Sequence, residues 1–134
     1  MTAAPSLTGE TQIRVRYAET DRMGLLHHAN YLVYFEQART DLLRQVGGNY
    51  KDLEDRGVLL VITRVEVKYR SPAYYDDLLT VRTTVTRTTP VRLEHSYAVF
   101  NPAGRLVAEG ATTLACVDRA GKIQAMPGWL SDAK

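Results

Sequence analysis

The sequence has few of the features that mark specialised classes of protein. It contains a single cysteine, so no intrachain disulfide can form, and this suits a reducing, cytoplasmic compartment. The longest wholly aliphatic run, residues 58–62, is far shorter than the roughly 20 residues that cross a bilayer. Residues 1–10 lack the charged and apolar regions of a secretory signal. A net charge of +2 is too small to indicate a nucleic-acid partner.

The size and composition suit one globular domain. The chain has 134 residues, of which 45% are hydrophobic and 24% charged, as is usual for such domains. It shows no internal repeat, low-complexity tract or linker. We therefore expect a flexible N-terminal tail over residues 1–10 and a single domain over residues 11–134.

The spacing of apolar residues predicts one long helix among several strands. Between about residues 28 and 46 they recur at three- and four-residue steps, and Gly47 and Gly48 follow as a left-handed helix cap requires. Alternation over residues 11–17 predicts a strand whose inward face ends at Tyr17. Further strands are expected at residues 64–70, 78–87, 91–100 and 105–118, with a short helical turn in 49–57.

Short turns between the later strands favour antiparallel pairing. The predicted fold class is therefore α+β, with one amphipathic helix wrapped by a curved antiparallel sheet of about five strands. An open sheet of this kind leaves edges that proteins often cover with another subunit. A homodimer is expected on this ground.

The segment between the first strand and the helix is dense in titratable side chains. Asp21 precedes Gly24, and His27 and His28 lie directly before the predicted helix. The first amides of a helix have no intrahelical acceptor and carry partial positive charge, so they can hold the oxygen of a polarised carbonyl. One such donor is worth roughly 2.7–4 kcal/mol in an acyl-transfer transition state. A carboxylate and a polarising amide are the two parts that thioester hydrolysis needs.

Three stretches of this region form a recognisable signature. Residues 16–24 (RYAETDRMG), 27–31 (HHANY) and 35–39 (FEQAR) resemble the hotdog-fold acyl-CoA thioesterases. The resemblance is to the branch that contains 4-hydroxybenzoyl-CoA thioesterase and the bacterial acyl-CoA thioesterases associated with the Tol–Pal system. It implies a hotdog fold, an acyl-CoA substrate, no metal or redox cofactor, and a homodimer that pairs again as a dimer of dimers, a homotetramer.

The resemblance also implies roles for particular residues. Asp21 is the implied catalytic carboxylate, as nucleophile or general base, and the His28 backbone N–H polarises the thioester carbonyl. The side chains of Tyr17 and His28 belong to the implied active site. The implied substrate-binding residues are Gly24, Asn30, Arg87, Thr88, Thr89 and Arg92, the last four around a turn where relatives often contact the nucleotide of coenzyme A.

Each catalytic candidate has a structural alternative. Asp21 could serve only as a turn or capping residue. Tyr17 could be a core residue of the first strand, and His28 could contribute only its backbone. Two adjacent histidines could suggest a metal, but successive side chains diverge and no third ligand has suitable spacing.

Other polar residues are expected to be structural. Asn30 and Glu36 are expected to hold the helix and the subunit contact. His95 is expected to be a packed strand residue, and Cys116 a buried small hydrophobic residue rather than a nucleophile. Arg119 and Lys122 are further candidates for contacts with phosphate.

Three functional alternatives remain beside acyl-CoA hydrolysis. A hydratase or dehydratase on the same fold has a different arrangement of acid and histidine. A non-catalytic acyl-CoA-binding module is disfavoured by the presence of Asp21, Gly24 and the spacing of His28 and Asn30. The residues do not distinguish coenzyme A from acyl carrier protein as the acyl donor, and they do not determine the acyl preference.

Overall fold

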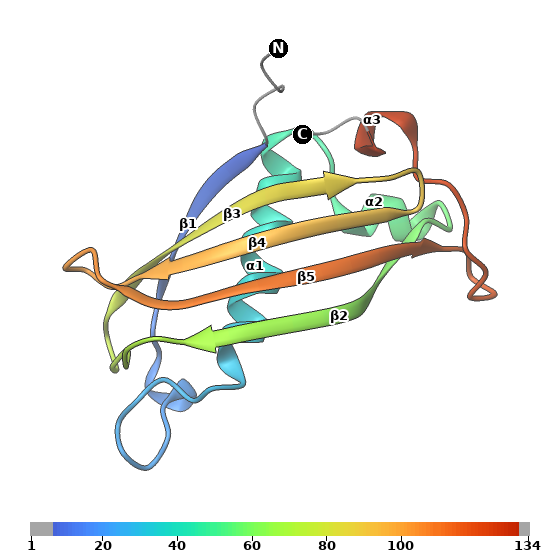
Figure 1. Cartoon of the computed structure of the whole chain (residues 1–134). Helices are drawn as coiled ribbons and strands as arrows, with labels where there is room; N and C mark the ends of the chain where they lie inside the picture. The colour runs from blue at the N-terminus through green and yellow to red at the C-terminus, as the bar shows by residue number, and fades with distance from the viewer. Residues whose placement is uncertain (1–6, 132–134) are drawn as a thin grey trace.

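A curved five-stranded antiparallel sheet wraps around one long helix in the computed structural model, which describes residues 7–131 (Figure 1). The strands are β1 (Thr8–Arg14), β2 (Leu59–Tyr69), β3 (Leu78–Thr88), β4 (Arg92–Phe100) and β5 (Leu106–Val117). Their order in the sheet is β1-β3-β4-β5-β2, and every neighbouring pair is antiparallel. The expected α+β class is confirmed.

The helices differ greatly in length. The long helix α1 (Asn30–Gln45) crosses the inner face of the sheet, and α2 (Tyr50–Asp55) follows it closely. A 3-10 helix, η1 (Tyr17–Glu19), and a four-residue helix, α3 (Gly128–Ser131), were not expected from the sequence. Among the described residues, no helix is both long and apolar enough to cross a membrane.

Helix α1 packs against the sheet through the apolar stripe that its sequence predicts. Tyr34, Phe35 and Leu42 are almost completely buried, and the Phe35 ring stacks on Tyr97 of β4 with ring centroids 4.2 Å apart. A Cβ atom on Gly110 of β5 would lie 2.6 Å from the Phe35 ring, so this glycine allows the helix to approach the sheet closely. The helix ends at Gln45, two residues before Gly47, whose φ of +87° confirms the predicted glycine stop.

The first strand differs from the prediction at both ends. It begins at Thr8, which pairs with Thr84 of β3, so residues 8–10 belong to the sheet; residues 1–6 lie outside the described part. It ends at Arg14, and Tyr17 is 78% exposed in η1. The expectation that Tyr17 continues the inward face was wrong. The carboxylate of Glu19 accepts a hydrogen bond from the backbone N–H of Arg16 (2.9 Å), and this contact turns the chain out of its extended path.

Strand β2 forms one edge of the sheet and is longer than expected. It starts at Leu59, within the aliphatic run, rather than near residue 64. Its edge and the adjacent side of α1 carry large apolar side chains exposed by 40% or more, including Leu32, Val33, Ile62 and Val65. An unpaired edge of 11 residues with exposed apolar neighbours is a surface on which another chain can pair.

Candidate active site

Asp21 lies in a tight turn that its own carboxylate closes. Its Oδ1 accepts hydrogen bonds from the N–H groups of Met23 (2.9 Å) and Leu25 (3.2 Å). Its backbone N–H donates to the Leu25 carbonyl (2.7 Å). Within residues 7–131, Asp21 Oδ2 has no hydrogen-bonding partner. One carboxylate oxygen therefore fixes the loop, and the other remains available for chemistry.

The same turn occurs twice more within residues 7–131, at Asn101 and at Asp118. Oδ1 of Asn101 accepts from the N–H groups two and four residues later (3.0 and 2.9 Å), and Oδ1 of Asp118 does the same (2.8 and 2.9 Å). In all three turns the fourth residue is a glycine with φ near +80°, a conformation that favours glycine. The glycines are Gly24, Gly104 and Gly121.

The Asp21 turn sits at the tip of a small hairpin. An isolated bridge joins Thr20 to Leu26, and the Leu26 N–H donates to the Ala73 carbonyl (2.8 Å). This contact holds the hairpin against the segment that leads into β3. In Figure 1 the hairpin is the blue loop at the end of the sheet where β2 finishes.

His28 follows the second arm of this hairpin and precedes α1. Its backbone N–H has no hydrogen-bond acceptor in the part of the chain that the structure describes. Its carbonyl accepts a hydrogen bond from the Tyr69 hydroxyl at the end of β2 (2.9 Å). The hydrogen bond from Tyr69 thus anchors the chain just before α1 to the sheet. The His28 N–H, which has no acceptor among the described residues, lies beside the start of the helix.

The side chains expected around this donor differ in what they contact. Asn30 donates from Nδ2 to the Glu19 carbonyl (2.9 Å), so it ties the helix to the hairpin, as the structural interpretation expected. The Tyr17 ring is exposed and lies edge-on to Tyr75 with centroids 5.5 Å apart. The rings of His27 and His28 stack with centroids 4.1 Å apart. Among the described residues, no three side chains of the types His, Cys, Asp and Glu cluster in a way that could hold a metal ion.

The four residues expected to contact the nucleotide lie far from Asp21 in the same protomer. They surround the turn between β3 and β4, at the opposite end of the sheet from the hairpin (Figure 1). Strand β3 has 11 residues, so its two ends are roughly 33 Å apart at about 3.3 Å per residue. One protomer therefore does not bring Arg87 or Arg92 to Asp21.

Within that turn, the arginines and threonines do different things. Arg87 and Arg92 are exposed. Oγ1 of Thr89 accepts hydrogen bonds from the N–H groups of Val91 (3.3 Å) and Arg92 (3.0 Å), so this side chain builds the turn. Oγ1 of Thr88 is buried, with no partner among the described residues. The guanidinium of Arg119 donates a hydrogen bond to the Asp55 carbonyl (2.8 Å) and so caps the end of α2.

A groove of about 210 Å³ runs between α1 and the edge strand β2. Most of its lining is apolar and includes Leu32, Phe35 and Val65, while Glu36 and Arg39 supply charge on the helix side. It lies beside the exposed apolar surface described above. This is a hollow of the kind that holds an apolar chain.

Two residues that support the site were not assigned roles from the sequence. Glu19 is buried and bonded to both the hairpin and α1, and Tyr69 holds the carbonyl of His28. Glu19 was missed because an acidic residue in a polar loop is usually exposed to solvent. Tyr69 was missed because its place in the alternating pattern is that of an ordinary strand residue. Only the folded arrangement reveals their contacts.

His95 and Cys116 are both buried, as expected. Burial, and to a lesser extent the positive charge of Arg39, lowers the pKa of His95 to about 4. Burial raises the pKa of the Cys116 thiol. A buried thiol that stays protonated is not a nucleophile.

The chain matches known proteins over most of its length. Residues 15–133 match the family model described as the thioesterase-like superfamily. The protein YneP of Bacillus subtilis is 38% identical over 81% of this chain and 78% of its own length. The acyl-CoA thioester hydrolase YbgC of Escherichia coli O157:H7 is 32% identical over 79% of both chains.

Solved structures agree with these matches. The DHNA-CoA thioesterase from Staphylococcus aureus is 34% identical and superposes with a TM-score of 0.86, covering 88% of this chain and 80% of the other. The expected hotdog fold is confirmed by these similarities.

Proposed function

Because the chain belongs to the thioesterase-like superfamily and is a thioester hydrolase, we propose that it hydrolyses acyl-CoA to a free acid and coenzyme A. Residues 11–134, together with residues 8–10 of β1, then act as a single catalytic domain, with Asp21 as the catalytic carboxylate. The observation that carries the proposal is the hairpin itself. It presents a carboxylate oxygen without a partner and, at the start of α1, a backbone N–H without an acceptor.

The proposed chemistry uses each group once. The His28 N–H holds the thioester oxygen as negative charge develops there, which stabilises the transition state. Asp21 Oδ2 either attacks the carbonyl carbon, giving a mixed anhydride that water then hydrolyses, or takes a proton from an attacking water. In both routes the C–S bond breaks, coenzyme A leaves as a thiolate, and one water is consumed in releasing the acid.

The acyl group is proposed to lie in the groove between α1 and β2. Support comes from its apolar lining, its volume of about 210 Å³ and its position beside the helix that starts at the site. Tyr17 and the His28 side chain are proposed to contact the substrate near the carbonyl. Gly24 is proposed to keep the Asp21 turn tight, through its φ of +79°.

A homodimer through β2 would complete the site. When two copies of β2 pair antiparallel, the Tyr69 end of one strand lies beside the Leu59 end of the other. The hairpin of one protomer then comes to the same end of the joined sheet as the partner's turn between β3 and β4. Arg87 and Arg92 of that turn would bind phosphates of coenzyme A.

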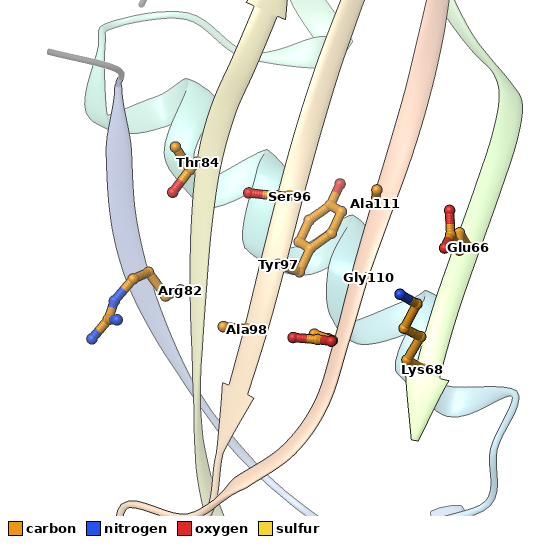
Figure 2. Close-up of a pocket in the computed structure, with 10 residues that line it drawn as sticks. Glu66, Lys68, Arg82, Thr84, Ser96, Tyr97, Ala98, Gly110 and Ala111 are labelled. Atoms are coloured by element: carbon orange, nitrogen blue, oxygen red, sulfur yellow. The ribbon is translucent and has the colours of Figure 1, made fainter. Parts of the chain in front are cut away.

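A second, weaker contact would pair two dimers through the outer face of the sheet. A hollow of about 370 Å³ lies there over the small residues Ser96, Ala98 and Ala111 (Figure 2). Lys68 and Arg82 border it together with two carboxylates. A face with both signs of charge can complement its own copy, as a twofold interface requires.

A thiol-release assay tests the proposed activity. The purified protein is given short, long and aromatic acyl-CoA thioesters and the matching acyl carrier protein thioesters. We expect release of coenzyme A from at least one acyl-CoA at about 10⁶-fold or more above the uncatalysed rate, the lower end of typical enzymatic accelerations. Binding without thiol release would instead identify a non-catalytic acyl-CoA-binding module. Thiol release only from the carrier protein thioesters would identify acyl carrier protein, and not coenzyme A, as the acyl donor.

A further inference from the structure

Glu19 is a buried carboxylate next to an exposed loop. Only 7% of its surface is exposed, and it is the one acidic residue classed as buried within residues 7–131. Taking a charge out of water is costly unless hydrogen bonds compensate it. The hydrogen-bond partners of Glu19 therefore have to compensate its charge.

The side chain of Glu19 joins the chain before the hairpin to helix α1. Its Oε1 accepts hydrogen bonds from the Arg16 N–H (2.9 Å) and from the Tyr34 hydroxyl (2.7 Å). Its Oε2 accepts from the Arg16 guanidinium (3.2 Å). Tyr34 is itself 1% exposed in the middle of the helix stripe, so the carboxylate is tied to a rigid part of the core.

The backbone carbonyl of Glu19 makes a second pair of contacts. It accepts hydrogen bonds from the His27 N–H (2.9 Å) and from Asn30 Nδ2 (2.9 Å). His27 precedes His28, and Glu19 lies two residues before Asp21. Glu19 thus contacts the chain on both sides of the hairpin, at Arg16 and His27. It also contacts two residues of α1, Asn30 and Tyr34.

A comparison with the matching turn at Asn101 shows why such a clamp is needed. That turn is held on both sides by strands β4 and β5, which pair along most of their length. The Asp21 hairpin is held instead by isolated contacts: Thr20 pairs with Leu26, Leu25 pairs with Tyr74, and the Leu26 N–H donates to the Ala73 carbonyl (2.8 Å). Glu19 supplies to this hairpin the fixed attachment that a strand ladder supplies at Asn101.

We propose that Glu19 is a positioning residue: through Tyr34 and His27 it fixes the Asp21 carboxylate relative to the His28 N–H. The inference rests on the proposed function. Two groups that must act on one carbonyl need a fixed separation, since a misplacement of about 1 Å can cost on the order of 100-fold in rate. The hydrogen bonds of Glu19 fix this separation because they tie the hairpin to Tyr34 in the rigid core.

The protonation states suit this role. Burial acts to raise the pKa of Glu19, but hydrogen bonds from Arg16 and Tyr34 outweigh it, and the net pKa is lowered. Burial, and then the hydrogen bond to Glu19, raises the pKa of Tyr34. The acid is therefore charged and the phenol protonated at neutral pH, as the short contact between them requires.

The substitution Tyr34→Phe tests the proposal because it removes one hydroxyl and keeps the ring in the core. We expect kcat for an acyl-CoA to fall about tenfold or more, while KM stays within about twofold and the affinity for free coenzyme A is unchanged. Glu19→Gln should give a smaller loss than Glu19→Ala, since the amide oxygen can still accept one hydrogen bond. Tyr50→Phe, which removes the hydroxyl of another partly buried tyrosine on α2, is the matched control and should keep its kcat.

The readouts separate positioning from simple stability. Rates are measured well below each melting temperature and corrected for the folded fraction by circular dichroism. Full kcat in Tyr34→Phe, or a loss that only follows the folded fraction, would overturn the proposal. A wild-type protein that hydrolyses no acyl-CoA would instead reject the proposed function, so the two failures are distinguishable.

Discussion

Asp21 and Asn101 occupy the same position in the same kind of turn. Each accepts hydrogen bonds through Oδ1 from the N–H groups two and four residues later, and each is followed at the fourth position by a glycine with positive φ. An amide oxygen therefore closes this turn as well as a carboxylate oxygen does. The turn alone gives no reason for a negative charge at residue 21, and the proposed catalytic role does.

The proposed nucleotide contacts predict a selective change in KM. Replacing Arg87 or Arg92 by Ala should raise KM for acyl-CoA by up to about fivefold each, because an exposed ion pair is worth up to about 1 kcal/mol. Hydrolysis of the same acyl group on pantetheine, which lacks the nucleotide, should not change. Arg82→Ala removes a positive charge from the outer sheet face and serves as the control. An equal effect on both substrates would argue against a nucleotide site at this turn.

The proposed dimer predicts that a charge on the β2 edge separates the subunits. Val65 is 43% exposed there, and Val65→Lys would place a positive charge on this apolar edge in both subunits of the proposed dimer. We expect light scattering to show a mass near the 15.0 kDa of one chain and thiol release to fall at least tenfold. Thr86→Lys, on an exposed position of β3, should leave both unchanged. A Val65→Lys protein that remains a dimer would refute pairing through this edge.

The sequence predicted those parts of the fold that repeat a simple period. The stripe of α1 with its Gly47 cap and the strands β3, β4 and β5 lie within a few residues of the expectation, because burial on one face imposes the spacing. The beginning of β1 and the break after Arg14 were missed. Both depend on partners distant in sequence or on a buried side chain, namely the pairing of Thr8 with Thr84 and the hydrogen bonds of Glu19.

The site was predictable only in part for the same reason. The resemblance selected Asp21 and His28 from their spacing, and the fold puts Asp21 at the tip of the hairpin and His28 directly after its second arm. The resemblance also grouped Arg92 with them, yet Arg92 begins β4, at the end of the sheet opposite the hairpin in one protomer. Sequence order does not reveal which subunit supplies a residue. The role inferred for Glu19 depends on burial, which a polar loop sequence conceals.

Buried His95 predicts a pH dependence of stability. Its pKa is lowered from 6.5 to about 4 in the folded protein, so between these values the unfolded chain binds a proton that the native protein does not. Stability should therefore fall as pH drops from about 6.5 towards 4, by on the order of 2 kcal/mol at pH 5 from this group. Urea unfolding at pH 7 and pH 5 measures the loss, which should be smaller in His95→Gln. An identical loss in both proteins would show that His95 is not responsible.

The central claim is that the charge of Asp21, and not its part in the turn, drives hydrolysis. Asp21→Asn keeps the Oδ1 acceptor that the turn uses, as Asn101 already does, and Asp118→Asn makes the same change in a matching turn away from the hairpin. Steady-state thiol release from the best acyl-CoA, with circular dichroism of each variant, compares the two. We predict that Asp21→Asn folds normally and loses at least about 100-fold in kcat, while Asp118→Asn stays within about twofold of the wild type. A folded Asp21→Asn protein with full activity would contradict the account.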